Sequence, residues 1–252
     1  EQIHTPIFER TELFNRSVGF SSDIVSKEMY IFEDKAKRSM ALRPEGTAPA
    51  LRAYIEKKLY NETYSHKLFY LGPMFRYERQ QAGRYRQFYQ FGVESIGSAS
   101  PFQDVEVIDC LYSLFSRLGL SGIKLYLNSI GDPSCRKKYR DALVKYFTPL
   151  ANQLSEDSQR RLNTNPMRIL DSKSSQDRPL IEKAPSILDY LGAPQREHFE
   201  KVKEGLHQLK IPFELNDHLV RGLDYYNRTV FEFVCGDLGA QDTIGAGGRY
   251  DP

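Results

Sequence analysis

The sequence predicts an α+β fold, in which an antiparallel β-sheet is flanked by helices and carries a mostly helical insertion. Residues 68–96 contain two bulky stretches, and in the second the side chains alternate with the period of two that is typical of strands. Residues 104–118 and 195–209 repeat apolar side chains every three or four positions, as amphipathic helices do. Between about 132 and 192 the strand pattern disappears and helical pieces remain.

Composition limits the classes of protein that the chain can belong to. Its 252 residues suffice for one large domain with an insertion, and 40% hydrophobic residues support a core. The formal charge of +2 means that any nucleic-acid contact must come from local patches. Three cysteines without a spacing pattern favour a reducing, cytoplasmic compartment and argue against disulfides or a zinc site. No apolar run approaches the roughly 20 residues of a membrane span, so we expect no membrane partner.

The N-terminal part predicts short strands and two helices. Residues 3–8 are extended, with Pro6 indicating an edge or a bulge, and residues 9–16 form a short helix. Residues 30–32 and 39–42 read as a hairpin around a charged turn. A helix over 48–58 follows, with Thr47 as its cap.

Glu45 lies in the loop before that helix and allows two interpretations. Strand-to-helix loops commonly carry binding or catalytic side chains. An acidic residue at a helix N-terminus is also favoured by the helix dipole alone. Position alone favours the role of a helix N-terminal acid over a role in ligand binding.

The stretch 70–97 is the centre of the functional prediction. An arginine-rich loop around Gly83 joins two strands, and on the far strand one face carries an aromatic ring, an amide and a carboxylate. The arginines are Arg76, Arg79, Arg84 and Arg86, and the face is formed by Phe88, Gln90 and Glu94. A solvated basic hairpin is one interpretation. The guanidinium groups suit phosphate oxygens, however, and the far strand favours a nucleotide held beside a cationic small molecule.

The second half of the chain contains three further features. A basic run in the helix that follows Asp132-Pro133, at 136–140, either contacts a phosphate backbone or is a solvated helix face. Arg221 and the pair Tyr225-Tyr226 stand where a strand begins, which favours a pocket wall. Residues 245–250 are predicted to form a glycine turn that permits close approach to a ligand.

Four blocks in this order resemble the histidyl-tRNA synthetases, which belong to the second structural class of aminoacyl-tRNA synthetases. They are LRPEGT (42–47), MFRYERQQAGRYRQFYQFGVE (74–94), LVRGLDYYNRTVFEF (219–233) and GAGGRYD (245–251). The resemblance extends over essentially the whole chain. It implies the catalytic fold of that class, in two parts, 1–131 and 193–252, separated by a helical insertion at 132–192.

The resemblance also implies substrates and a role for each matching residue. The substrates are L-histidine, ATP with Mg²⁺, and tRNA(His), with no metal site built by the protein. Arg76 and Arg221 match the catalytic arginines near the α-phosphate. The implied ATP contacts are Arg76, Glu78, Arg84 and Phe88. The implied histidine contacts are Glu45, Thr47, Gln90, Glu94, Arg221, Tyr225, Tyr226, Gly248 and Tyr250.

The chain departs from the family pattern at both ends. The family continues past GGRYD into a strand, a helix with another ATP-binding arginine, and an anticodon-binding domain, and it begins with a longer dimerisation segment. We therefore expect a catalytic-core fragment that is weak or inactive alone, and a homodimer for the intact protein.

Two other functional classes compete with the ligase. One is the histidine-sensing regulatory subunit of ATP phosphoribosyltransferase, a non-catalytic paralogue that keeps the fold and a histidine pocket. A pure sensor does not need the residues that suit ATP chemistry, Arg76, Arg84, Phe88 and Arg221, which favours the synthetase. The near-neutral charge disfavours the other class, a bare RNA-binding module.

Overall fold

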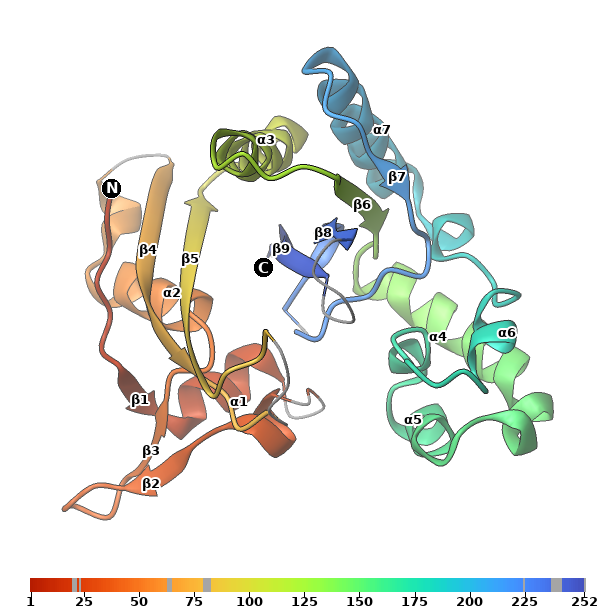
Figure 1. Cartoon of the computed structure of the whole chain (residues 1–252), viewed down its shortest axis with the longest axis horizontal. Helices are drawn as coiled ribbons and strands as arrows, with labels where there is room; N and C mark the ends of the chain where they lie inside the picture. The colour runs from red at the N-terminus through yellow and green to blue at the C-terminus, as the bar shows by residue number, and fades with distance from the viewer. Residues whose placement is uncertain are drawn as a thin grey trace. The chain divides into compact units, whose positions relative to one another are not determined.

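The computed structural model describes residues 1–252 except 20–21, 23, 63–64, 79–82, 224, 237–241 and 252 (Figure 1). The chain divides into two compact units. The first consists of Glu1–Ala99 and Gly222–Tyr225, and the second of Ser100–Arg221 and Tyr226–Pro252. Each unit has its own strands, helices and buried core.

The first unit combines a three-stranded antiparallel sheet, in the order β1-β3-β2, with the long hairpin β4-β5. Phe14 and Ala41 are completely buried in its core, where Ala48 joins them. The predicted hairpins at 30–42 and 68–96 are both confirmed. The elements are β1 (Phe8–Arg10), α1 (Thr11–Val18), the π-helix η1 (Ile24–Glu28), β2 (Ile31–Glu33), β3 (Ser39–Leu42), α2 (Thr47–Glu56), the 3₁₀ helix η2 (Leu59–Asn61), β4 (His66–Phe75) and β5 (Gln87–Ile96).

The second unit contains a four-stranded sheet in the order β7-β6-β8-β9. Its pairs are antiparallel except β6 with β7, which run parallel. The elements are α3 (Pro101–Arg117), β6 (Ile123–Ser129), α4 (Pro133–Phe147), η3 (Thr148–Gln153), α5 (Glu156–Thr164), η4 (Pro166–Ile169), α6 (Arg178–Ile181), η5 (Ile187–Tyr190), α7 (Ala193–Gln208), β7 (Glu214–Leu215), β8 (Asn227–Cys235) and β9 (Thr243–Arg249).

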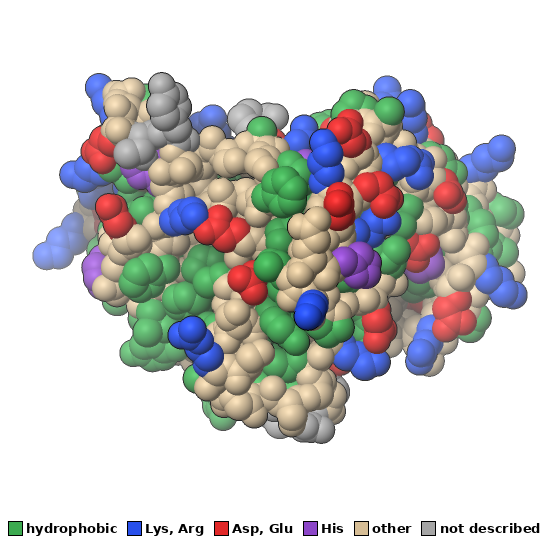
Figure 2. Space-filling view, turned by 90° about the horizontal axis from the view of Figure 1, so that it is seen from above, with side chains coloured by type: hydrophobic (Ala, Val, Ile, Leu, Met, Phe, Trp, Pro, Cys, Tyr) green, Lys and Arg blue, Asp and Glu red, His purple; other side chains and the backbone are tan. Residues whose placement is uncertain are grey.

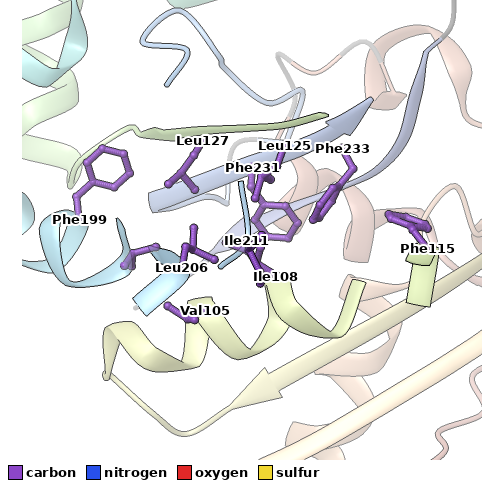
Figure 3. Packing of buried hydrophobic residues seen from close by; sticks show 11 residues of the cluster. Val105, Ile108, Phe115, Leu125, Leu127, Phe199, Leu206, Ile211, Phe231 and Phe233 are labelled. Atoms are coloured by element: carbon purple, nitrogen blue, oxygen red, sulfur yellow. The ribbon is translucent and has the colours of Figure 1, made fainter. Parts of the chain in front are cut away.

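Helices α3 and α7 supply the core of the second unit together with strands β6 and β8 (Figure 3). Each helix presents an apolar stripe, and the strands present alternate side chains such as Phe231 and Phe233 to the same core, as their sequence periods predict. Pro101 and the side chain of Ser100 begin α3, and Gly119, with a φ of 73°, follows its end. The predicted α+β architecture is therefore present, with one helical layer packed on this sheet.

Residues 133–192 contain helices and loops and no strand, as the sequence predicts. Asp132 caps α4 by accepting a hydrogen bond from the backbone N–H of Cys135 at 2.8 Å. The wholly buried Asp177 accepts hydrogen bonds from the hydroxyl groups of Ser155, Ser158 and Ser172. A buried carboxylate with this many donors is satisfied within the fold, so we assign it a structural role.

The glycine turn predicted at 245–250 is wrong, because Thr243–Arg249 form strand β9 beside β8. The glycines let this strand lie against aromatic rings. A Cβ atom at Gly245 would lie 2.9 Å from the ring of Phe115, and one at Gly247 would lie 2.7 Å from the ring of Phe231. Core packing therefore explains two of these glycines without a ligand.

Acidic and basic side chains are interspersed on the face seen in Figure 2, in keeping with the near-neutral formal charge. Among the residues that the structure describes, no helix is long and apolar enough to cross a membrane.

Candidate active site

Strands β4 and β5 carry several of the predicted site residues on one face of their hairpin, here called the inner face, on which Phe88, Gln90 and Glu94 lie. Their register places Met74 opposite Phe88, Gly72 opposite Gln90, and Leu68 opposite Glu94. Since alternate residues of a strand project to the same face, Phe88, Gln90 and Glu94 lie on one side of the hairpin, as predicted. Glu94 is buried there, with 6% of its surface exposed.

The end of the hairpin gathers the residues expected to bind ATP. The Nε of Arg76 donates to the carbonyl of Pro44 at 2.8 Å, and its guanidinium carbon lies 5.2 Å from the centre of the Phe88 ring. Glu78 forms ion pairs with Arg84 at 2.9 Å and with Arg76 at 3.8 Å. Two guanidinium groups therefore converge on one carboxylate beside an aromatic ring.

The other two arginines of this loop are Arg79 and Arg86. The guanidinium carbon of Arg86 lies 3.9 Å from the centre of the Tyr77 ring, and its Nε donates to the carbonyl of Glu78 at 3.4 Å. Arg86 thus supports the loop rather than projecting from it. Arg79 lies outside the described residues.

Glu45 caps helix α2. Its two carboxylate oxygens accept the backbone N–H groups of Thr47 at 2.7 Å and Ala48 at 2.9 Å. Burial raises the pKa of Glu45 above its usual value, although these two N–H donors oppose the shift. The interpretation of Glu45 as an acid at the helix N-terminus is confirmed, and a role for it in ligand binding stays a prediction.

The prediction that Thr47 caps α2 through its side chain is wrong. Gly46 occupies the N-cap position, and the Thr47 hydroxyl instead donates to Oε1 of Glu94 at 2.7 Å. Glu45 already satisfies the helix N-terminus, which leaves the hydroxyl available for this tertiary contact. Thr47 and Glu94, 47 residues apart, are therefore joined on the inner face of the hairpin.

Tyr70 is a site residue that the sequence reasoning did not single out. Its hydroxyl donates to Oε1 of Glu94 at 3.2 Å. Its ring fills the space in which a Cβ atom would lie at Gly46 or at Gly92, 2.2 Å from the nearest ring atom in each case. A glycine in the middle of strand β5, directly opposite Tyr70, was the available sequence signal.

Gln90 carries an unsatisfied polar atom on this face. Its Oε1 is buried and has no hydrogen-bond partner among the described residues. An acceptor left unpaired in this way costs about 1–3 kcal/mol, and a ligand that donates a hydrogen bond would satisfy it. A role for Gln90 in ligand binding stays a prediction.

Of the residues expected to bind histidine, the second unit holds Arg221, Tyr226, Gly248 and Tyr250, while Tyr225 belongs to the first unit. The guanidinium of Arg221 donates to Glu232 at 3.1 Å. Tyr226 is buried, and its carbonyl accepts a hydrogen bond from Arg136 of α4. The Cβ position of Gly248 lies 2.9 Å from the Tyr226 ring and 2.7 Å from the carbonyl oxygen of Thr229. Gly248 is therefore required for the close approach of β9 to Tyr226 and β8.

A buried polar cluster supports this part of β9. Asp104 accepts hydrogen bonds from Thr229 at 2.6 Å, His198 at 2.8 Å and Arg249 at 2.5 Å, and Arg249 also pairs with Asp251. Because a carboxylate only accepts, His198 carries its proton on Nε2. Burial acts to lower the pKa of Arg249, but the carboxylates of Asp104 and Asp251 outweigh it and raise that pKa.

The predicted site residues thus form two groups. Glu45, Thr47, Arg76, Glu78, Arg84, Phe88, Gln90, Glu94 and Tyr225 belong to the first unit, and Arg221, Tyr226, Gly248 and Tyr250 to the second. Within the first group, the contacts bring together Arg76, Glu78, Arg84 and Phe88, and separately Glu45, Thr47 and Glu94. Within the second, they bring Tyr226 to Gly248, while Arg221 pairs with Glu232, which the sequence reasoning did not consider.

Comparison with known proteins gives consistent matches. The family model described as histidyl-tRNA synthetase matches residues 1–252. A histidine–tRNA ligase of Protochlamydia amoebophila is 61% identical over 251 residues, which cover 100% of this chain and 59% of that protein. This chain therefore spans about three-fifths of the length of the curated relatives it matches.

Solved structures agree with the sequence matches. The apo histidyl-tRNA synthetase of S. aureus superposes with a TM-score of 0.76 at 42% identity, covering 100% of this chain and 58% of that one. An ATP phosphoribosyltransferase regulatory subunit/histidyl-tRNA synthetase from Bacillus halodurans superposes with a TM-score of 0.69 at 25% identity, covering 100% and 67%. The fold is that of the second synthetase class, as the sequence resemblance predicted.

Proposed function

This chain belongs to the histidyl-tRNA synthetase family, and we propose that it forms the catalytic core of a histidine–tRNA ligase. In the proposed reaction, the histidine carboxylate attacks the α-phosphate of ATP, pyrophosphate leaves, and the histidyl group passes to the terminal ribose of tRNA(His). The observation that carries the proposal is the convergence of Arg76 and Arg84 on Glu78, with the Phe88 ring within 5.2 Å of the Arg76 guanidinium.

The arginines suit the charge that develops during this reaction. A carboxylate approaching a triphosphate brings two anions together, so the site must supply fixed positive charge. We assign Arg76 and Arg221 to the α-phosphate and Arg84 to the β- and γ-phosphates. Phe88 stacks on adenine and Glu78 meets its polar edge. Glu78 also holds the two loop guanidinium groups in place before ATP arrives, which lowers the cost of ordering them.

The acceptors on the inner hairpin face suit the amino acid. We assign the α-ammonium group of histidine to Glu45, Thr47 and Gln90, since a cation needs acceptors and the Gln90 amide oxygen is buried without one. We assign one imidazole nitrogen to Glu94 and the other to Tyr226, which would fix the ring tautomer. Tyr225, Gly248 and Tyr250 complete the proposed histidine contacts.

We place Mg²⁺ with the ATP, because this ion prefers phosphate oxygens and water to cages of protein ligands. The part of the chain that the structure describes contains no group of three or more His, Cys, Asp or Glu that could hold a metal ion. Mg²⁺ supplies additional neutralisation of phosphate charge when ATP binds. We also propose a cytoplasmic location and the domain division 1–131, 132–192 and 193–252.

We further propose that the intact protein is a homodimer. The outer face of the β4-β5 hairpin exposes a row of apolar and aromatic side chains, formed by Phe69, Leu71, Tyr89 and Phe91. Leu71 and Tyr89 are 59% and 72% exposed. An apolar patch of this kind on a sheet face favours contact with a second copy of the chain.

Direct binding of an analogue of the reaction intermediate tests the proposal. We expect a non-hydrolysable histidyl-adenylate analogue to bind much more tightly than histidine in calorimetry, and the seryl analogue to bind far more weakly. Arg76→Ala should weaken analogue binding about tenfold to a hundredfold through the loss of charge-assisted hydrogen bonds. The matched control is Arg178→Ala, since the Arg178 side chain is 81% exposed on a helix of the insertion.

Two outcomes would contradict the ligase. Equal affinity for the histidyl and seryl analogues would remove histidine as the substrate. Histidine binding with no gain from the adenylate moiety would favour the alternative, a histidine-sensing regulatory subunit of ATP phosphoribosyltransferase.

A further inference from the structure

Arg221 is held by a carboxylate from the middle of strand β8. The Nη1 group of Arg221 donates to Oε1 of Glu232 at 3.1 Å, and the hydroxyl of Thr243 donates to the same oxygen at 2.6 Å. The side chains of Arg221 and Glu232 are 24% and 19% exposed. Two strands and the segment before β8 therefore meet at one carboxylate oxygen.

Glu232 lies on the sheet face opposite the core of α3 and α7. Its neighbours Phe231 and Phe233 point into that core, so Glu232 points to the other face. Ala246 is its partner in β9, and Gly248 lies two residues further along the same strand. Glu232 and Gly248, one of the expected histidine contacts, therefore share one face of the sheet.

The guanidinium of Arg221 is only partly satisfied. Its Nε is buried and has no hydrogen-bond partner among the described residues. One edge of the group is thus held by Glu232, while a buried donor on the Nε side lacks an acceptor. A structural ion pair gains nothing from an unpaired buried N–H, which costs about 1–3 kcal/mol. The unpaired Nε is explained if the Arg221 guanidinium is oriented to bind an incoming anionic oxygen.

We propose that Glu232 is a positioning residue for Arg221, and that Thr243 fixes Glu232 in turn. This inference rests on the proposed ligase function, in which Arg221 neutralises charge at the α-phosphate. Arginine has many rotamers, and a cation is most effective when it is oriented before the reaction. Glu232 restricts the guanidinium to one orientation and leaves its Nε side for the anion.

The test is Glu232→Gln in the complete protein, with histidine-dependent pyrophosphate exchange and histidine binding measured separately. We expect kcat to fall about tenfold or more, with the dissociation constant of histidine changed less than about twofold, because the lost orientation acts on the charge of the transition state. Glu214→Gln is the matched control. Glu214 lies in β7 of the same sheet and pairs with Lys124 at 3.2 Å, but its side chain is 56% exposed.

A double-mutant cycle separates positioning from a general loss of stability. If Glu232 acts through Arg221, Glu232→Gln should have little further effect on kcat in an Arg221→Ala background. Additive losses would overturn the inference. An increase in kcat for Glu232→Gln would also overturn it, because Glu232 would then withhold Arg221 rather than present it.

A second variant covers the case in which Glu232→Gln does not fold. Thr243→Val removes the hydroxyl that fixes Glu232 at an exposed position, and it should lower kcat severalfold without changing histidine affinity. Unchanged kcat for both variants, with Arg221→Ala strongly impaired, would refute the inference alone. Unchanged kcat for Arg221→Ala would refute the assigned role of Arg221 in the proposed function.

Discussion

Removal of the Asp104 carboxylate should destabilise the second unit more than any surface charge change. The side chains of Asp104, His198 and Arg249 are at most 7% exposed, and Thr229 is 1% exposed. Asp104→Ala removes the acceptor of the buried Thr229 hydroxyl and of the His198 ring N–H. It also deprives Arg249 of one of its two carboxylates, while Asp251 and the Ser100 carbonyl remain. Breaking a buried pair by removing one partner typically costs 3–5 kcal/mol, and the remaining Asp251 places our expectation at about 3 kcal/mol.

The assay is urea unfolding followed by far-UV circular dichroism and tyrosine fluorescence, since the chain has 16 tyrosines and no tryptophan. Because the chain has two units, hydrogen exchange of α3 and β9 peptides identifies the unit that is affected. The exposed pair of Glu197 with Lys201 provides the control. Glu197→Ala should cost no more than about 0.5 kcal/mol.

A double variant tests the reasoning directly. Asp104→Ala combined with Arg249→Met replaces both charged partners, and it should be more stable than Asp104→Ala alone, because no guanidinium then lacks its partner in the core. The electrostatic account would be refuted if Asp104→Ala lowered the free energy of unfolding by less than about 1 kcal/mol. It would also be refuted if the double variant lost as much stability as the two single variants added together.

Two further predictions concern the cap of α4 and the hairpin. Hydrogen bonds from Cys135 and Ser134 lower the pKa of Asp132 from 3.8 to about 2. A lowered carboxyl pKa stabilises the fold above pH 3.8 and ceases to do so as the pH falls through about 2. Asp132→Ala should therefore cost about 1 kcal/mol at pH 7, and urea titrations should show that cost shrinking towards pH 2; a constant cost would contradict this. Gly92→Ala should displace the Tyr70 ring and weaken histidine binding measured by calorimetry. Gly236→Ala is the control and should leave histidine binding unchanged, because a Cβ atom at Gly236 meets nothing within 4 Å. Equal histidine affinities of the two variants would exclude the proposed packing of Tyr70.

The sequence predicted most of the fold because local periods determine it. The alternation in residues 87–96 specifies which side chains share a face once β5 pairs with β4, and Phe88, Gln90 and Glu94 do share one. The apolar stripe of α3 can likewise be recognised from the sequence alone, because the spacing of its apolar residues indicates which face of the helix packs on the core.

The errors and omissions arose where a side chain finds a distant partner. Thr47 has the sequence position of a helix cap, but Glu45 supplies the cap and Glu94, 47 residues away, takes the hydroxyl. The contact of Tyr70 with Glu94 depends on the strand register, and the choice of Glu232 as the partner of Arg221 depends on the path of the chain between them. Neither leaves a periodic signal, and only Gly92, a glycine inside a strand, pointed to the first.

The glycine-rich strand β9 explains why buried charges surround its end. Gly245, Gly247 and Gly248 contribute no side chains to packing, so apolar contacts alone hold this strand weakly in position. Arg249 supplies directional bonds in their place, to Asp104 of α3 and to Asp251 beyond the strand. Directional bonds fix the register of a strand where non-directional apolar packing does not. Fixing register is the best-supported use of buried ion pairs in other proteins. The glycines that bring β9 close to Tyr226 therefore make the strand depend on the Asp104 cluster for its position. Loss of that cluster should make the position of Gly248 less fixed before the unit unfolds.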